Sequence, residues 1–163
     1  MKKLLIALIM LLPFAVTAQE KTSPVNPLSA LLNSYYDIKN ALVNSDANTA
    51  SEKAANFVKE MKAIDEKTLS VSDLKTYNSL KEKLEFDATH ISETKDVSHQ
   101  RDHFSSFSTN MYLLVKAAKP TSNPVFQMYC PMKKNYWLSN EKAVKNPYYG
   151  KQMLTCGQVK SIL

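Results

Sequence analysis

The chain has 163 residues, of which 44% are hydrophobic and 22% are charged, and its formal net charge is +6. This length suits a single domain with a buried core. The two glycines, Gly150 and Gly157, cannot form the glycine-rich phosphate-binding loops of dinucleotide folds and P-loops. The composition therefore excludes a nucleotide cofactor of those kinds, and it argues against turn-rich all-β folds, which need residues at positive φ.

The first residues have the pattern of a secretory signal peptide. Two lysines precede an apolar run over residues 4–16, and small residues follow up to Ala18. The run is too short to span a bilayer comfortably, and Gln19 stands where a lipoprotein signal would place a cysteine. We expect cleavage after Ala18, giving residues 1–18 as the signal peptide, and then a flexible segment over 19–27. The product would be a soluble periplasmic protein with no membrane span and, since its basic residues form no cluster, no nucleic-acid partner.

The stretch between Pro27 and Pro120 contains neither proline nor glycine, and its apolar residues recur at helical spacing. Asp46, Ser70 and Asp96 lie at polar breaks and are suited to cap the second, third and fourth helices. The four apolar stripes are, in chain order, Leu28, Leu31, Leu32, Tyr35, Ile38 and Leu42; Ala50, Ala54, Phe57, Val58, Met61 and Ile64; Leu74, Tyr77, Leu84, Ala88 and Ile91; and Phe104, Phe107, Met111, Leu114 and Val115. We predict a mostly all-α fold, an antiparallel four-helix bundle over residues 28–118.

The composition changes over residues 119–163, where prolines return and where both glycines and both cysteines lie. Aromatic residues crowd this segment, so it does not resemble a disordered linker, which would be polar and poor in aromatics. We expect an irregular, aromatic- and Cys/Met-rich C-terminal cap that packs on the bundle, with a short strand near residues 125–129. Bundle and cap together would form a single helical domain over 28–163.

Sulfur-bearing residues are concentrated in this cap. Met128, Cys130 and Met132 alternate, so in an extended segment their side chains would share a face. Met153 and Cys156 are three residues apart and would be neighbours in a helical turn. Thiolate and thioether sulfurs favour copper(I) or silver(I) over hard cations. The spacing therefore predicts a soft-metal site, although methionine also fills gaps in ordinary cores.

The two cysteines have a second interpretation. An exported protein with two cysteines commonly pairs them, and a Cys130–Cys156 disulfide would stabilise the cap by about 3–4 kcal/mol. The sequence leaves open this disulfide, the metal site, and redox-active or free thiols as alternatives. There is no C-x-x-C motif of the thioredoxin type.

All three histidines lie within residues 90–103. His99 and His103 are four residues apart and would share a helical face, and the turn between two helices could bring His90 close to them. Imidazole nitrogens are common metal ligands, so the three histidines are candidate additional donors. The alternative is an exposed pair that is either solvated or salt-bridged to Asp96 or Asp102.

The aromatic residues of the cap suggest an anchor and a partner surface. Trp137 would attach the cap to the bundle, and Tyr136, Tyr148 and Tyr149 with Trp137 form a candidate partner-binding patch. No nucleophile elbow and no zinc-protease helix motif is present in the sequence. We therefore expect a protein that is not an enzyme.

Several motifs resemble one family. They are Gln100-Arg101-x-His103-Phe104 in the fourth predicted helix, and Tyr129-Cys130-Pro131-Met132, Trp137-Leu138-Ser139 and Asn146-Pro147-Tyr148-Tyr149-Gly150-Lys151-x-Met153-Leu154-x-Cys156-Gly157 in the cap. This pattern is similar to the domain-of-unknown-function family numbered three-three-four-seven, and the resemblance extends over essentially the whole mature chain. Members are typically small exported proteins of Gram-negative bacteria, and the domain is also found fused to periplasmic adaptor subunits of copper and silver efflux pumps.

The resemblance implies a periplasmic copper- or silver-binding accessory or buffering protein linked to heavy-metal efflux, with an efflux adaptor as a possible protein partner. A weaker local similarity, to the Tyr-x-Cys-Pro-Met motif of copper-transporting pumps, implies Cys130 and Met132 as ligands. Lys133 replaces the histidine of that motif. The alternative is a disulfide-stapled helical module that binds a periplasmic protein.

Overall fold

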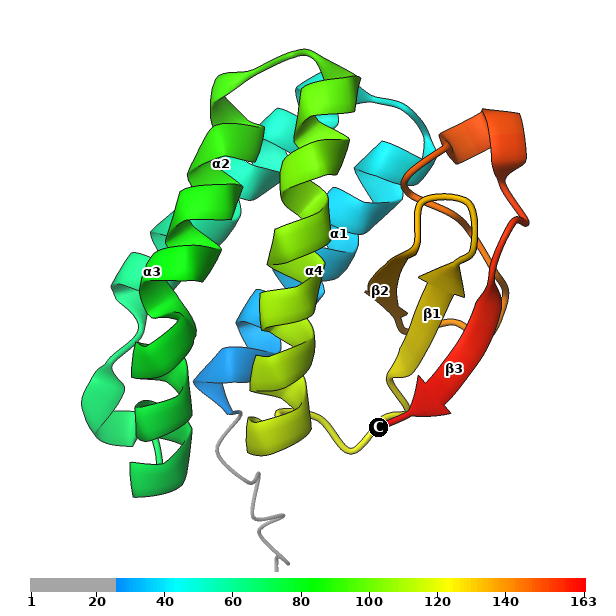
Figure 1. Ribbon diagram of the computed structural model, residues 1–163. Coiled ribbons are helices and arrows are strands. Elements are labelled where there is room, and N and C mark those ends of the chain that lie inside the picture. The colour runs from blue at the N-terminus through cyan, green and yellow to red at the C-terminus, as the bar shows by residue number, and fades with distance from the viewer. Residues whose placement is uncertain (1–25) are drawn as a thin grey trace, which may run out of the picture.

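The computed structural model describes residues 26–163, which form four α-helices followed by a small sheet (Figure 1). The elements are α1 Pro27–Val43, α2 Ala47–Ala63, the 3-10 turn η1 Glu66–Thr68, α3 Val71–Glu93, α4 Val97–Ala118, β1 Phe126–Cys130, β2 Asn135–Ser139, the 3-10 turn η2 Gly150–Met153, and β3 Gln158–Ile162. The predicted signal peptide over 1–18 and nearly all of the predicted segment 19–27 lie outside the described residues. Within residues 26–163 no helix combines the length and the apolar character needed to cross a bilayer.

Each helix begins at a side-chain cap. The carboxylate of Asp46 accepts a hydrogen bond from the Thr49 amide at 3.0 Å, and the Asp96 carboxylate accepts one from Ser98 at 2.8 Å. The Ser70 hydroxyl accepts from the amide of the third helical residue at 3.1 Å. These contacts satisfy amide groups that have no partner inside the first turn. The three predicted caps are therefore confirmed.

The helices form a mostly α, bundle-like layer. Each helix packs against the next one along the chain, and α1 also contacts α4. The predicted apolar stripes supply the core of this layer, apart from three members that are only half-buried, namely Val58, Ile64 and Leu74. Burial of these faces is the main favourable contribution to the stability of the fold.

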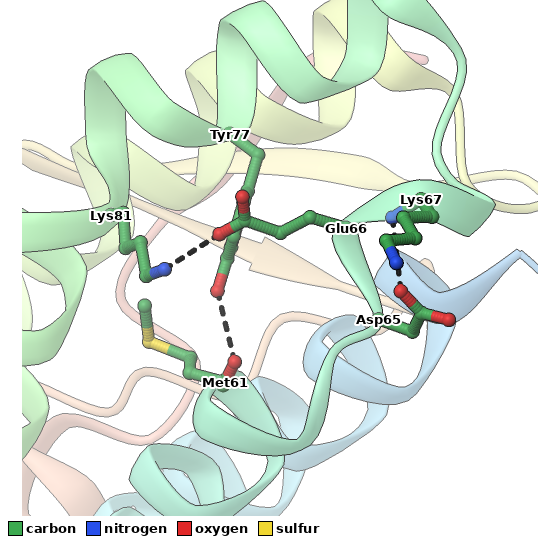
Figure 2. Close-up of polar contacts among 6 residues, drawn as sticks. All are labelled: Met61, Asp65, Glu66, Lys67, Tyr77 and Lys81. Carbon is green, nitrogen blue, oxygen red and sulfur yellow. Dashed lines mark hydrogen bonds and ion pairs between the residues drawn. The ribbon is translucent and has the colours of Figure 1, made fainter.

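The connection between α2 and α3 is fixed by polar contacts (Figure 2). The Tyr77 hydroxyl donates to the carbonyl oxygen of Met61 at 3.1 Å, and this joins the last turn of α2 to α3. Lys81 forms an ion pair with Glu66 of η1, with Nζ and Oε1 2.7 Å apart. The short turn is thus attached to α3 through the side chain of Glu66.

The cap is more regular than the sequence predicts. The strand expected near residues 125–129 is present as β1, but it is the centre of a three-stranded antiparallel sheet in the order β2-β1-β3. The irregular cap was therefore a wrong prediction. Both outer strands have only five residues, and so short a strand gives little alternation by which to recognise it. An irregularity in the β1–β3 register occurs between Gln127 and Met128.

Buried side chains join the sheet to the helices. The Tyr35 hydroxyl of α1 accepts a hydrogen bond from the Leu138 amide of β2 at 2.9 Å, and it lies 2.8 Å from the Ser108 hydroxyl of α4. Trp137 of β2 is 1% exposed and belongs to the same core cluster as the helices. Its predicted role as the anchor of the cap agrees with this position.

Arg101 of α4 forms a second link. Its guanidinium donates to the Pro147 carbonyl at 2.8 Å, to the Leu42 carbonyl at 3.1 Å and to the Ser45 hydroxyl at 2.9 Å. Gly150 lies against this contact with a φ of +56°, and a Cβ there would lie 2.5 Å from Ser45 Oγ. This turn therefore needs glycine, for space as well as for φ.

Candidate metal centre

The three histidines converge at the connection between α3 and α4. His90 lies in the last turn of α3, whereas His99 and His103 lie one turn apart on α4. One nitrogen of each ring can be chosen so that all three atoms lie within 4.8 Å of one another. His90 and His103 are half-buried and His99 is exposed. The structure thus brings together the pair predicted from its spacing and the third histidine from the neighbouring helix.

The rings are packed against one another. His90 and His103 are stacked with centroids 4.5 Å apart and an interplanar angle of 4°, and His99 meets His103 edge-on at 4.8 Å. Phe86, which is 57% exposed, has its ring 4.4 Å from that of His90. These aromatic contacts bring the three imidazoles together at the junction of α3 and α4.

Gln100 holds the two helix ends in this arrangement. Its side chain is fully buried between the elements, and its amide nitrogen lies 3.2 Å from the Ile91 carbonyl and 2.9 Å from the Thr94 carbonyl. The same nitrogen lies 2.9 Å from the carbonyl oxygen of Ala47 at the start of α2. Because Gln100 immediately follows His99, these bonds fix the start of α4 against the end of α3.

A carboxylate that the sequence analysis did not select contacts the cluster. Asp87 of α3 is 4% exposed, and its Oδ1 lies 3.2 Å from Nδ1 of His103. The salt-bridge partners expected for the histidines were wrong, since Asp102 pairs with Lys133 at 3.6 Å and Asp96 caps α4. Asp87 lies three residues before His90 and therefore on the same face of α3. That spacing is the one sequence signal that could have identified it.

The three histidines could hold a transition-metal ion. Imidazole nitrogens bind zinc, copper, iron and nickel, and three protein ligands with an open position are typical of exchangeable or reactive metal sites. Ligand histidines generally donate their other ring N–H to a carboxylate. Within residues 26–163, the three histidines and Asp87 supply both features.

The predicted sulfur residues do not share one face. Met128 and Cys130 point into the core from β1 and are fully buried, whereas Met132 is 61% exposed. Alternation fails at Met132 because β1 ends at Cys130 and the chain then turns, with Lys134 at a φ of +57°. Met153 is half-buried in η2, and its carbonyl accepts from the Cys156 amide at 3.0 Å, so these two are neighbours as predicted.

No disulfide joins the two cysteines. Cys130 is buried, Cys156 is half-buried, both are free, and they are not at disulfide distance. The predicted Cys130–Cys156 staple is therefore corrected. Desolvation raises the pKa of the Cys156 thiol above its ordinary value, and the adjacent Cys130 thiol raises it further.

Hydrogen bonds of the buried Asn146 side chain join these segments in place of a disulfide. Its amide nitrogen donates to Cys130 Sγ at 3.2 Å and to the Cys156 carbonyl at 2.6 Å, and its Oδ1 accepts from the Tyr148 amide at 2.8 Å. One amide group thus connects β1, the segment before β3 and the turn that leads into η2.

Most of the predicted partner surface is covered. Trp137 and Tyr148 are buried, Tyr149 is half-buried, and only Tyr136 is exposed, at 41%. The Tyr148 hydroxyl donates to the Tyr136 carbonyl, and its ring meets Trp137 edge-on at 6.1 Å. These rings serve mainly to attach the cap to α4, which reduces the support for an aromatic docking patch.

Comparison with known proteins identifies the family alone. Nothing among curated proteins and nothing among solved structures matches the chain. A family model described as "Protein of unknown function (DUF3347)" matches residues 31–123, more than half of the chain. The match covers α2, α3, α4 and all of α1 except its first turn, and therefore all three histidines, whereas the cap motifs that carried the resemblance lie beyond it. The chain belongs to this family of proteins of unknown function.

Proposed function

We propose that this protein binds a copper ion through His90, His99 and His103 and acts as an accessory or buffering protein for soft metals. The observation that carries the proposal is the convergence of one nitrogen from each of the three rings to within 4.8 Å. Two histidines four residues apart are common on helices, but a third from another helix at the same point is a much more specific arrangement.

The choice of copper follows from the available donors. Imidazole accepts copper, zinc and nickel, while thiol and thioether sulfurs accept copper(I) and silver(I). Copper is the ion that suits both groups, with affinities of divalent ions generally peaking at copper. In this proposal the sulfurs of Cys130, Met153, Cys156 and Met128 form a second, separate donor group, which silver(I) would also fit, whereas Met132 is exposed on the turn after β1 and is left out of it.

The cellular setting is part of the same proposal. Export to the periplasm is inferred from the signal-like sequence over residues 1–18, and delivery of the ion to an efflux adaptor is inferred from the family resemblance. The short connections between consecutive helices favour an antiparallel bundle. Such a bundle would give the centre a rigid support while leaving His99 exposed for entry of the ion.

The test is a metal titration of tag-free, metal-free protein, since an affinity tag of histidines would supply its own site. Copper(II) and zinc(II), and copper(I) under anaerobic conditions, compete against a chromophoric chelator of known affinity. We expect one copper(II) ion per chain, with the copper(II) affinity reduced at least tenfold in each of His90→Ala, His99→Ala and His103→Ala. Removal of one of three ligands leaves an incomplete site.

Matched controls separate the two donor groups. Met132→Leu removes an exposed sulfur, and Cys130→Ser with Cys156→Ser removes the thiols, without altering the histidines. Unchanged copper(II) binding in these variants supports the histidine centre. Failure of the native protein to compete for copper, or full binding after all three histidines are replaced, would overturn the proposal.

A further inference from the structure

Asp87 is the buried acidic group nearest the candidate metal centre. Its side chain is 6% exposed and the side chain of His103 is 19% exposed, so their contact at 3.2 Å is largely shielded from water. Within residues 26–163, the ion-pair partner of Asp87 is His103 rather than a lysine or an arginine. A carboxylate in such a position needs a hydrogen-bond donor, because leaving a buried charge uncompensated is costly.

The contact restricts which nitrogen of His103 can bind a metal. Oδ1 of Asp87 lies opposite Nδ1, and an ionised carboxylate only accepts hydrogen bonds. The proton of a neutral His103 ring is therefore favoured on Nδ1, and the lone pair is then on Nε2. The ring of His90 is stacked on the face of the His103 ring with an interplanar angle of 4°, while the contact with Asp87 determines which edge of the His103 ring faces the carboxylate.

We infer that Asp87 is a positioning residue of the histidine centre. It holds His103 as the Nδ1–H tautomer, directs Nε2 toward the ion, and increases the donor strength of this imidazole by its negative charge. The ion it favours is a divalent one, since the buried charge adds to the attraction without occupying a ligand position. This inference rests on the proposed function and extends it to the Asp87 carboxylate, which orients His103 in the metal-free protein.

The first readout needs no metal. Two-bond proton–nitrogen correlation spectra of metal-free, 15N-labelled protein at pH 8 distinguish the two tautomers of each histidine. We expect His103 to have its proton on Nδ1 in the native protein and in Asp87→Asn, whose amide oxygen can still accept this bond. In Asp87→Ala the restraint is gone, and the proton should move largely to Nε2.

The second readout is copper(II) affinity in the same variants. We expect a loss of about 10- to 100-fold in Asp87→Ala, in the range found for outer-shell partners of metal ligands, and a smaller loss in Asp87→Asn. Asp102→Asn is the matched control, because it removes a carboxylate one residue from His103 that pairs with Lys133 instead. Because the Asp102 carboxylate is exposed and screened by solvent, its removal should change the copper(II) affinity by no more than about twofold.

The outcomes separate the two proposals. If native protein binds no copper, the proposed function fails, whatever the tautomer. If native protein binds copper but His103 carries its proton on Nε2, or if Asp87→Ala binds as tightly as native protein, the positioning role alone is wrong. Far-ultraviolet circular dichroism and thermal unfolding establish that each variant folds, and Asp87→Asn, which keeps the side-chain shape, remains informative if Asp87→Ala is destabilised.

Discussion

The helical layer and the C-terminal cap differ in how they arrange side chains that can bind metals. In the helices, three histidines gather at the junction of α3 and α4, and one of them is exposed to solvent. In the sheet, the sulfurs are dispersed between the core and the surface, as buried Cys130 and exposed Met132 illustrate. Helices present side chains four residues apart on one face without further help. A short strand keeps alternate side chains on one face only as far as its last paired residue, and the turn that follows changes their direction.

This difference separates two kinds of role. The buried sulfurs and rings of the cap contact the core, so their first contribution is to stability. The histidines lie at the margin of the core, where the helix ends are held by Gln100 and where a ligand can approach. The comparison predicts that changes in the cap will alter folding, while changes at the histidines will alter binding.

The largest expected effect on stability is that of Trp137→Ala. The indole is 1% exposed and contacts the ring of Tyr148, so its removal leaves a cavity between sheet and helices. We expect a loss of about 3–5 kcal/mol in the free energy of unfolding, measured by denaturant titration. The neighbouring Tyr136→Ala, which truncates an exposed ring, should cost about 1 kcal/mol or less. Equal losses in the two variants would mean that the sheet is not anchored through Trp137.

The next effect depends on pH and concerns Lys39 of α1. Its side chain is 1% exposed, and desolvation lowers the pKa of its amine to about 8, with Glu141 of the cap acting in the opposite direction. Between pH 8 and the ordinary lysine value near 10.5, the unfolded chain binds a proton that the folded chain lacks. The contribution of Lys39 to the free energy of unfolding should therefore rise with pH across this interval. The raised pKa values of the tyrosines Tyr35, Tyr36, Tyr77 and Tyr148 lower the free energy of unfolding near pH 10, so the effect of Lys39 is obtained from the difference between variants.

Lys39→Met removes the amine while keeping a long apolar side chain. At pH 7 we expect it to stabilise the protein by on the order of 3 kcal/mol, and to remove the Lys39 contribution to the pH dependence between pH 8 and 10.5. Denaturant titrations at pH 7, 8, 9 and 10 measure both effects relative to Lys142→Met, an exposed control. A pH dependence that is the same in Lys39→Met and in native protein would contradict this account of Lys39.

A smaller effect is expected from Tyr35→Phe. The hydroxyl of Tyr35 accepts from the Leu138 amide and lies 2.8 Å from Ser108, so its loss leaves buried polar groups without this partner. We expect a loss of about 1–3 kcal/mol in the free energy of unfolding, with copper affinity unchanged. Tyr112→Phe, on a half-buried ring of α4, serves as control. An equal loss of unfolding free energy in Tyr112→Phe and in Tyr35→Phe would mean that the buried hydrogen bonds of Tyr35 contribute no more to stability than the hydroxyl of a half-buried tyrosine.

Sequence reasoning was most successful where a local rule determines the structure. The caps Asp46, Ser70 and Asp96 and the apolar stripes follow from hydrogen-bonding needs and helical periodicity within a few residues. The meeting of His99 with His103 follows from the same spacing. The approach of these two histidines to His90 depends on the turn between α3 and α4. The sequence indicates that this turn could bring His90 close, but it does not determine the geometry of the turn.

Features that depend on distant segments were missed. The outer strands β2 and β3 are recognisable mainly by their pairing with β1, since five residues give little periodic signal. The buried role of Asn146 depends on three segments that meet only in the folded chain. The role of Asp87 is not evident from its place in α3, because it depends on the contact with His103 of α4 that forms only in the folded chain.

The measurement that tests the central claim most directly is X-ray absorption at the copper edge of protein loaded with one equivalent of copper(II). Compared with His103→Ala, it identifies the donor atoms themselves rather than an affinity. We predict nitrogen scattering with the multiple-scattering signature of imidazole, reduced in His103→Ala and unchanged in Cys130→Ser. A first shell containing sulfur, or a spectrum unchanged by His103→Ala, would contradict the assignment of the ion to the histidines at the α3–α4 junction.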